Sequence, residues 1–225
     1  MLRNTIAILR KDFKIELRSK ILISQVIPIV GALIIVFGFA FGPSKEKLQS
    51  VSAGMVWIAI VLATLFVAQR IFAQEAQNDA KENLLALAVD SSEIFLAKSI
   101  LSFIEITSLG IITFGAVLAI SSPQDMTLKA CGLALIGLFL GGAALAFLST
   151  LYGAITFLSA SKDTLMPLLF LPAASPILLS ATELTNPLFG GSYPPLLTWA
   201  GLLLLMTITY LAVGLIAFEV MVEEQ

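Results

Sequence analysis

The feature that most constrains this chain is a series of long apolar runs that carry few charges or none. Residues 21–42 contain no charged side chain at all, and about 20 predominantly apolar residues are enough for a helix to cross a lipid bilayer. Only 12% of the 225 residues are charged and the mean hydropathy is +0.99, whereas soluble domains carry about 25% charged residues. The sequence therefore predicts an all-α integral membrane protein.

Six runs of this kind predict six transmembrane helices within a single domain that covers the whole chain. Short polar loops separate most of the runs, and one longer polar insert separates the second from the third. The expected spans are residues 21–42, 51–68, 94–120, 130–160, 164–182 and 193–218.

The lysines and arginines predict the orientation, because loops on the cytoplasmic side of a membrane carry an excess of both. With a cytoplasmic N-terminus, only Lys45, Lys47 and Lys129 of the 13 lysines and arginines lie outside. Six spans return the C-terminus to the cytoplasm as well. Aromatic rings favour the headgroup region, and the residues expected near the outer ends of their spans are Trp57, Tyr193 and Trp199.

Residues 1–20 predict an amphipathic helix ahead of the first span. Apolar side chains recur there at spacings of three and four, with lysines and arginines on the other faces. A helix of this kind lies in the plane of a membrane surface, with its cations toward anionic lipid. Two roles stay open, a topology anchor and an elbow helix that moves with the bundle. The apolar positions are Leu2, Ile6, Leu9, Phe13 and Leu17.

A polar, helix-prone insert, residues 69–93, interrupts the apolar runs. Its Ala, Glu, Lys, Leu and Gln residues favour a helix, and the "DSSE" at residues 90–93 fits a cap for the helix that follows. The insert also has an apolar face, formed by Leu84, Leu85 and Leu87, which a solvated loop does not need. We expect a short helix across the cytoplasmic face, which either docks into a groove of a partner protein or rests on the bilayer.

Two charged residues fall inside or next to the third expected span. Glu105 is costly in a membrane, so such a residue is expected to face the bundle or water. A structural polar contact inside the bundle and a role in coupling or in a substrate pathway are equally weighted for it. Lys98 lies seven residues earlier, about 10 Å along a helix, and is expected to extend its ammonium to the membrane interface.

Prolines and glycines predict how the later spans pack. Three prolines in the fifth span, Pro167, Pro172 and Pro176, remove backbone hydrogen bonds and predict a bent helix, with a re-entrant helical pair as the alternative. A second group of small residues in the fourth span suits close helix packing. Its members are Gly137, Gly141 and Gly142.

Composition excludes several kinds of function. The chain has no histidine and a single cysteine, Cys131, so a zinc site and haem ligation by histidine are excluded. The sequence contains no GxxxxGK[ST] phosphate loop and no basic tract that suits nucleic acid. We therefore expect no catalytic residue, no metal and no cofactor bound by this chain, and a packing role for Cys131.

Two stretches resemble a known family. The "RIF" at residues 70–72, the acid at Glu75, "ENLLAL" and "FLAKS" are similar to the CcmB family, also called haem exporter protein B. "LFLPAASPILLSAT", with its Pro172 and Pro176, is similar to a second motif of that family. The resemblance covers essentially the whole chain. Positions that depart from the family pattern are Gln69, Glu75, Asp79 and Ala88.

The resemblance implies a permease subunit of an ATP-binding cassette (ABC) complex in cytochrome c maturation, built like ABC-2-type transporters, in the bacterial inner membrane. ATP and Mg²⁺ would stay on a CcmA-type ATPase, whose hydrolysis drives release of the haem-loaded chaperone CcmE, haem export, or both. CcmC and CcmD are the other implied partners, besides a second copy of the chain. The implied coupling residues are Arg70, Phe72, Glu75, Asp79, Glu82, Leu84 and Leu85.

Two other functions remain open at this point. One is an ABC-2 permease for an unrelated lipid or glycan, and the other is a membrane scaffold that moves no substrate. Neither requires a catalytic residue in this chain.

Overall fold

The computed structural model describes residues 2–19, 24, 26–41, 44–72, 90–123, 126–158 and 165–223. These residues form helices and no strand, which confirms the all-α prediction for the described ranges. The elements are α1 (Leu2–Ser19), α2 (Ile27–Phe41), α3 (Lys45–Arg70), α6 (Ser91–Ser121), α7 (Leu128–Leu158), α8 (Leu165–Thr185), the 3₁₀-helix η2 (Asn186–Phe189) and α9 (Leu196–Glu223).

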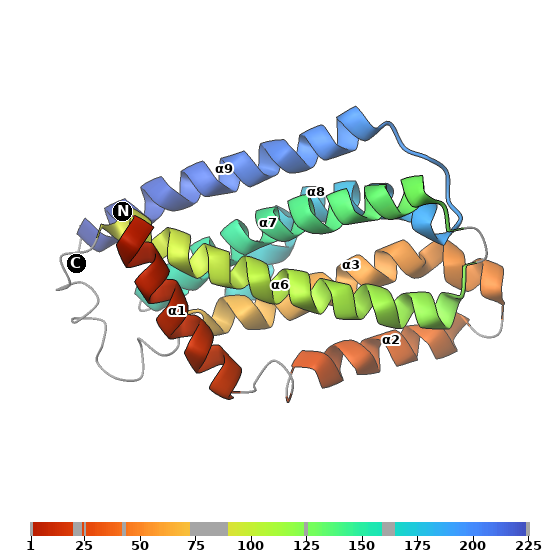
Figure 1. The fold of residues 1–225 in the computed structure, drawn as a ribbon, viewed down its shortest axis with the longest axis horizontal. Coiled ribbons are helices and arrows are strands. Elements are labelled where there is room, and N and C mark those ends of the chain that lie inside the picture. Colours follow the sequence, from red (N-terminus) through yellow and green to blue (C-terminus); the bar gives the residue numbers. More distant parts are fainter. Residues whose placement is uncertain are drawn as a thin grey trace.

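The long helices lie side by side and α1 crosses one end of them (Figure 1). α3 runs through the middle of the bundle and α9 along its edge, since 72% of the most apolar stretch is buried in α3 and 17% in α9. α3 and α9 finish, and α6 starts, at the end that α1 crosses. This end, called the α1 end below, is therefore where the polar insert leaves and re-enters the bundle.

Four of the expected spans are confirmed as helices long and apolar enough to cross a membrane. They cover Lys45–Arg70, Ser91–Ser121, Leu128–Thr156 and Leu196–Val222. α2 is apolar but has 15 residues, fewer than the roughly 20 that a span needs. α8 has 21 residues and contains two prolines. Among the described residues, the structure therefore shows a helical protein with four helices that are long and apolar enough to cross a membrane.

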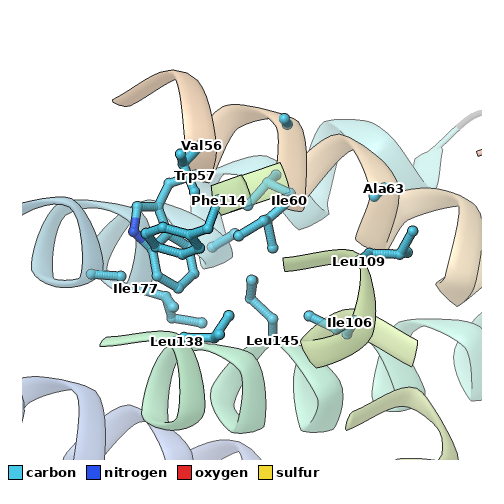
Figure 2. Packing of buried hydrophobic residues seen from close by; sticks show 14 of the residues in the cluster. Val56, Trp57, Ile60, Ala63, Ile106, Leu109, Phe114, Leu138, Leu145 and Ile177 are labelled. Atoms are coloured by element: carbon cyan, nitrogen blue, oxygen red, sulfur yellow. The ribbon is translucent and has the colours of Figure 1, made fainter. Parts of the chain in front are cut away.

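The main core forms around Trp57 of α3, and Figure 2 shows its packing. Trp57 is fully buried, its Nε1 donates a hydrogen bond to Thr185 Oγ1 at 3.1 Å, and its ring meets Phe114 edge-on at 6.5 Å. The prediction that Trp57 lies at an outer interface is wrong. Because α3 starts at Lys45 and not at residue 51, Trp57 lies about 18 Å into the helix. Tyr193, by contrast, is 47% exposed in the loop before α9.

The glycines of α7 allow its neighbours to approach closely, as expected. A Cβ added to Gly141 would lie 2.7 Å from Trp57 Cη2, and one added to Gly137 would lie 3.3 Å from Thr185 Cγ2. Gly142 faces α6, where the nearest atom to an added Cβ is Thr107 Oγ1 at 3.4 Å. The tryptophan ring occupies space that any side chain at position 141 would need.

α8 is one continuous helix over Leu165–Thr185, with Pro167 in its first turn and Pro172 and Pro176 inside it. The structure therefore shows no re-entrant pair over these residues, whereas a proline-induced bend stays a prediction. Because Pro176 has no N–H, the carbonyl of Pro172 loses its backbone partner. Ser175 Oγ donates to that carbonyl at 2.8 Å, which satisfies it.

Candidate functional site at the root of the polar insert

The polar insert is attached through the end of α3 and the start of α6. Of the predicted coupling residues, Arg70 and Phe72 are described, whereas Glu75, Asp79, Glu82, Leu84 and Leu85 lie outside the described residues. Asp90 is the N-cap residue of α6, as predicted, but its side chain makes no capping hydrogen bond. Its carbonyl instead accepts from the Glu93 N–H at 2.9 Å.

Aromatic side chains pack the two ends of the insert against α9. These ends are the last turn of α3 with the two residues after it and the first turns of α6, and they are called the roots of the insert below. Phe72 follows α3, is 3% exposed, and stacks on Phe218 of α9 with the ring centroids 6.0 Å apart. Phe218 in turn lies 6.0 Å from Phe95 in the second turn of α6. These rings belong to a small apolar cluster separate from the main core. The residues before and after the insert are thus packed into one unit.

Arg70, the last residue of α3, is bound by Glu16 of α1. Its Nη2 donates to Oε1 at 2.7 Å and to Oε2 at 2.6 Å. The side chains are 21% and 13% exposed, respectively. Charge-assisted hydrogen bonds of this length are about twice as strong as neutral ones. The described contacts of Arg70 are therefore directed to α1.

Lys98 of α6 is buried, so the prediction that its ammonium reaches the interface is wrong. Its Nζ lies 3.0 Å from Asp12 Oδ2 and donates to the carbonyl of Ile71 at 2.9 Å. The same ammonium lies 5.4 Å from the centroid of the Phe72 ring. Lys98 thus joins α1, the end of α3 and α6, and Asp12 supplies the opposite charge that allows it to stay buried.

Two different faces of α1 explain these contacts. Thr5 and Asp12 are 8% and 4% exposed and face the bundle, whereas Ile6 and Phe13 of the predicted apolar stripe are 46% and 40% exposed. The bundle-facing residues also recur at spacings of three and four. This second periodicity, with two acids inside a basic segment, was the signal in the sequence that could have predicted the ion pairs. Residues on this face include Thr5, Ile8, Asp12 and Glu16.

Glu105 of α6 lies beside these two ion pairs. It is 8% exposed and lines a small cavity together with the two ion pairs. The cavity measures about 20 Å³, which is room for about one water molecule. We call this set the polar junction. Its members are Asp12, Glu16, Arg70, Lys98 and Glu105.

The polar junction has three acids and two cations, and it is suited to holding helices together and not to binding a ligand. Its cavity is far smaller than the 300–1,000 Å³ typical of small-molecule sites. Within the ranges that the structure describes, neither these acids nor any other group of three or more His, Cys, Asp or Glu side chains is arranged to hold a metal ion. The side chains do connect three helices at the point where the insert begins and ends. The arrangement can therefore hold the insert in place, or transmit a movement of the insert to the three helices.

Fold and site together define a helical membrane protein whose polar insert is anchored by ion pairs between α1, α3 and α6. The family described as CcmB protein matches residues 3–224. The chain therefore belongs to the CcmB family, as the sequence motifs predicted.

Curated relatives of this chain are proteins named heme exporter protein B. The protein from Rhodobacter capsulatus is 28% identical over 152 residues, 66% of each chain. The one from Pseudomonas aeruginosa is 25% identical over 147 residues, 65% of each chain. The Escherichia coli K12 protein is 25% identical over 91 residues, 40% of this chain and 41% of its own. The alignments thus span about two thirds or less of these relatives' length.

Proposed function

We propose that this chain is the non-catalytic membrane permease subunit of a haem-exporter-type ABC complex in cytochrome c maturation. Membership of the CcmB family and relatives named heme exporter protein B support this function. The observation that carries the mechanism is the polar junction, where Arg70 and Lys98 fix both roots of residues 73–89. A segment attached in this way suits the transfer of force from a partner protein.

The proposed topology has six spans with both termini in the cytoplasm of a bacterial inner membrane. α2 and α8 add two spans to the four long apolar helices. The basic residues of α1, with Arg70 and Lys98, gather at the α1 end, whereas Lys45 and Lys129 start α3 and α7 at the opposite end. By the positive-inside rule, the α1 end faces the cytoplasm. The polar insert then faces a cytosolic ATPase.

In the proposed mechanism the CcmA-type ATPase binds residues 73–89 and moves them during its cycle. Glu75, Asp79, Glu82, Leu84 and Leu85 would contact the ATPase, with leucines in a groove and acids at its rim. Arg70 and Phe72 would not touch the ATPase but would pass the movement of the insert to the helices, since their described contacts lie within this chain. Movement of the insert would therefore reach α3, α6 and α9 directly.

The proposed complex also contains CcmC, CcmD and the chaperone CcmE, and a second copy of this chain is a further partner. Haem is cargo in this account, and ATP and Mg²⁺ belong to the ATPase. The cavity of the polar junction measures about 20 Å³, which is too small for haem, so the junction itself suits a mechanical role. The mechanical character of the junction also fits a second candidate, a subunit that drives CcmE release without passing haem through itself.

The test is purification of the complex from membranes with variants of the insert. Glu75→Ala and Leu84→Ala are expected to lower the amount of ATPase that purifies with the chain. Glu46→Ala, an exposed acid in the first turn of α3 at the opposite end, is the matched control and should leave it unchanged. Unchanged ATPase binding in both insert variants would contradict the proposal. Haem flux into vesicles with an active ATPase separates export from chaperone release alone.

A further inference from the structure

α1 contacts both roots of the polar insert through its two acidic residues. Glu16 binds Arg70, the last residue of α3, and Asp12 binds Lys98, in the second turn of α6. α3 leads into residues 73–89 and α6 follows them. The two attachments of the insert are therefore held by one helix that comes from elsewhere in the sequence, 54 residues before Arg70 in the case of Glu16.

Both ion pairs are withdrawn from water. The side chains of Lys98 and Asp12 are 3% and 5% exposed, and those of Arg70 and Glu16 are 21% and 13% exposed. Exposed ion pairs contribute little because solvent screens them. Separating a buried pair, in contrast, leaves an uncompensated charge in a medium of low dielectric constant. The two pairs therefore resist sliding of α1 along α3 or α6.

Two further hydrogen bonds strengthen the attachment of α1, α3 and α6 to one another. Lys98 donates to the carbonyl of Ile71 at 2.9 Å, one residue beyond α3, so the chain leaving α3 is tied to α6 itself. Asn4 of α1 also donates to Glu93 Oε2 at 3.0 Å, in the first turn of α6. On a different face of α1, Ile6 and Phe13 are exposed. The polar face is thus the one that joins α1 to the insert roots.

We propose that Asp12 and Glu16 are positioning residues of the coupling apparatus. They clamp the end of α3 and the start of α6, so that displacement of residues 73–89 moves α1, α3 and α6 together. The inference rests on the proposed function, because the ATPase supplies the displacement. Without the clamp, movement of the insert would be absorbed at its roots and would not reach the spans.

The experiment uses the whole complex reconstituted with its ATPase, with haem-loaded CcmE as the probe. Three quantities are measured, namely the ATPase content, the rate of ATP hydrolysis, and the CcmE released per ATP hydrolysed. Asp12→Asn and Glu16→Gln, which keep size and remove charge, should retain ATPase content but lower release per ATP about fivefold or more. Lys14→Gln, which removes an exposed charge from the same helix, is the matched control and should change nothing.

Two further variants separate positioning from folding. Glu16→Asp keeps the charge on a shorter arm and should recover part of the release per ATP. Arg70→Gln combined with Glu16→Gln should lose no more than Glu16→Gln alone, since coupled residues are not additive. If Asp12→Asn does not fold, the clamp is tested by Glu16→Gln and Glu16→Asp alone. The quantity compared is again the CcmE released per ATP hydrolysed.

The outcomes of this experiment distinguish the two proposals. Wild-type release per ATP in Glu16→Gln and Asp12→Asn complexes of normal ATPase content would overturn the clamp. A loss of release that only follows the loss of folded complex would overturn it too, because the acids would then be structural. A wild-type chain that binds no ATPase and releases no CcmE would instead contradict the proposed function.

Discussion

The core around Trp57 and the polar junction are both buried, yet different forces hold them together. The core is almost wholly apolar, and Trp57 has one polar partner in it, Thr185 at 3.1 Å. The polar junction brings three acidic residues and two cations together around a cavity of about 20 Å³. Apolar packing fixes the arrangement of the helices in the core, whereas ion pairs withdrawn from water hold α1 to the end of α3 and the start of α6. The chain thus places its charged contacts where the insert attaches.

Loss of Lys98 should have the largest effect, because it serves α1, α3 and α6 at once. Lys98→Met removes the buried cation of Asp12 and leaves it only Lys11, whose Nζ lies 3.1 Å from Asp12 Oδ1 but whose side chain is 53% exposed. The change should cost about 3 kcal/mol of unfolding free energy, the lower end of the range for a broken buried ion pair. The double variant Lys98→Met with Asp12→Leu should recover most of this loss, since a hydrophobic pair of similar volume often replaces a buried ion pair. Thermal or denaturant unfolding in detergent measures both. A double variant no more stable than the single one would contradict the account.

The core should respond to added volume and not to charge. Gly141→Ala places a methyl group 2.7 Å from Trp57 Cη2, and such overpacking costs about 1–3 kcal/mol. In a Trp57→Leu background the same change should cost less, because the ring that it meets is gone. The same unfolding measurement applies. Equal costs in the two backgrounds would show that the ring does not set the limit.

Glu105 tests whether an acid of the polar junction outside the two ion pairs matters as much for stability as Lys98. It shares the polar junction with two balanced ion pairs, so it is the surplus acidic residue there. Glu105→Gln keeps its shape and should change the unfolding free energy by less than about 1 kcal/mol, in contrast to Lys98→Met. A loss as large as that of Lys98→Met would assign Glu105 a structural contact equal to the ion pairs.

The smallest effect is expected on the outer face of α9. Leu205 is 55% exposed in α9, the least buried of the four long apolar helices. Leu205→Ala should change the unfolding free energy by no more than about 0.5 kcal/mol, whereas Leu203→Ala, fully buried on the same helix, should cost about 2–5 kcal/mol. Similar losses for the two leucines would mean that a partner chain covers Leu205.

The helical class, four of the spans and the family followed from the sequence, because apolar length and short motifs are local signals. α7 at Leu128–Leu158 lies within two residues of its predicted bounds at either end. Lys98 and Trp57 were misplaced because their environments are set by distant residues. Lys98 is buried only because Asp12 arrives from α1, and Trp57 is central only because α3 extends six residues before the expected span.

For the glycines of α7 the sequence predicted the close packing but not the neighbour. Gly141 was expected to allow close packing, and the structure shows the ring that uses the space. The identity of that ring, 84 positions earlier in the chain, could not be read from local spacing. The coupling residues Glu75, Asp79, Glu82, Leu84 and Leu85 lie outside the described residues, so their contact with an ATPase stays a prediction.

The most direct test of the account is the side of the membrane on which the polar insert lies and what covers it there. Asp79→Cys is placed in a Cys131→Ser background, where it is the sole thiol, since the chain has one cysteine. A membrane-impermeant thiol reagent should label it in inside-out vesicles, and bound ATPase should protect it. Labelling only in right-side-out vesicles would place the insert on the far side of the membrane, beyond reach of a cytosolic ATPase, and would contradict the account.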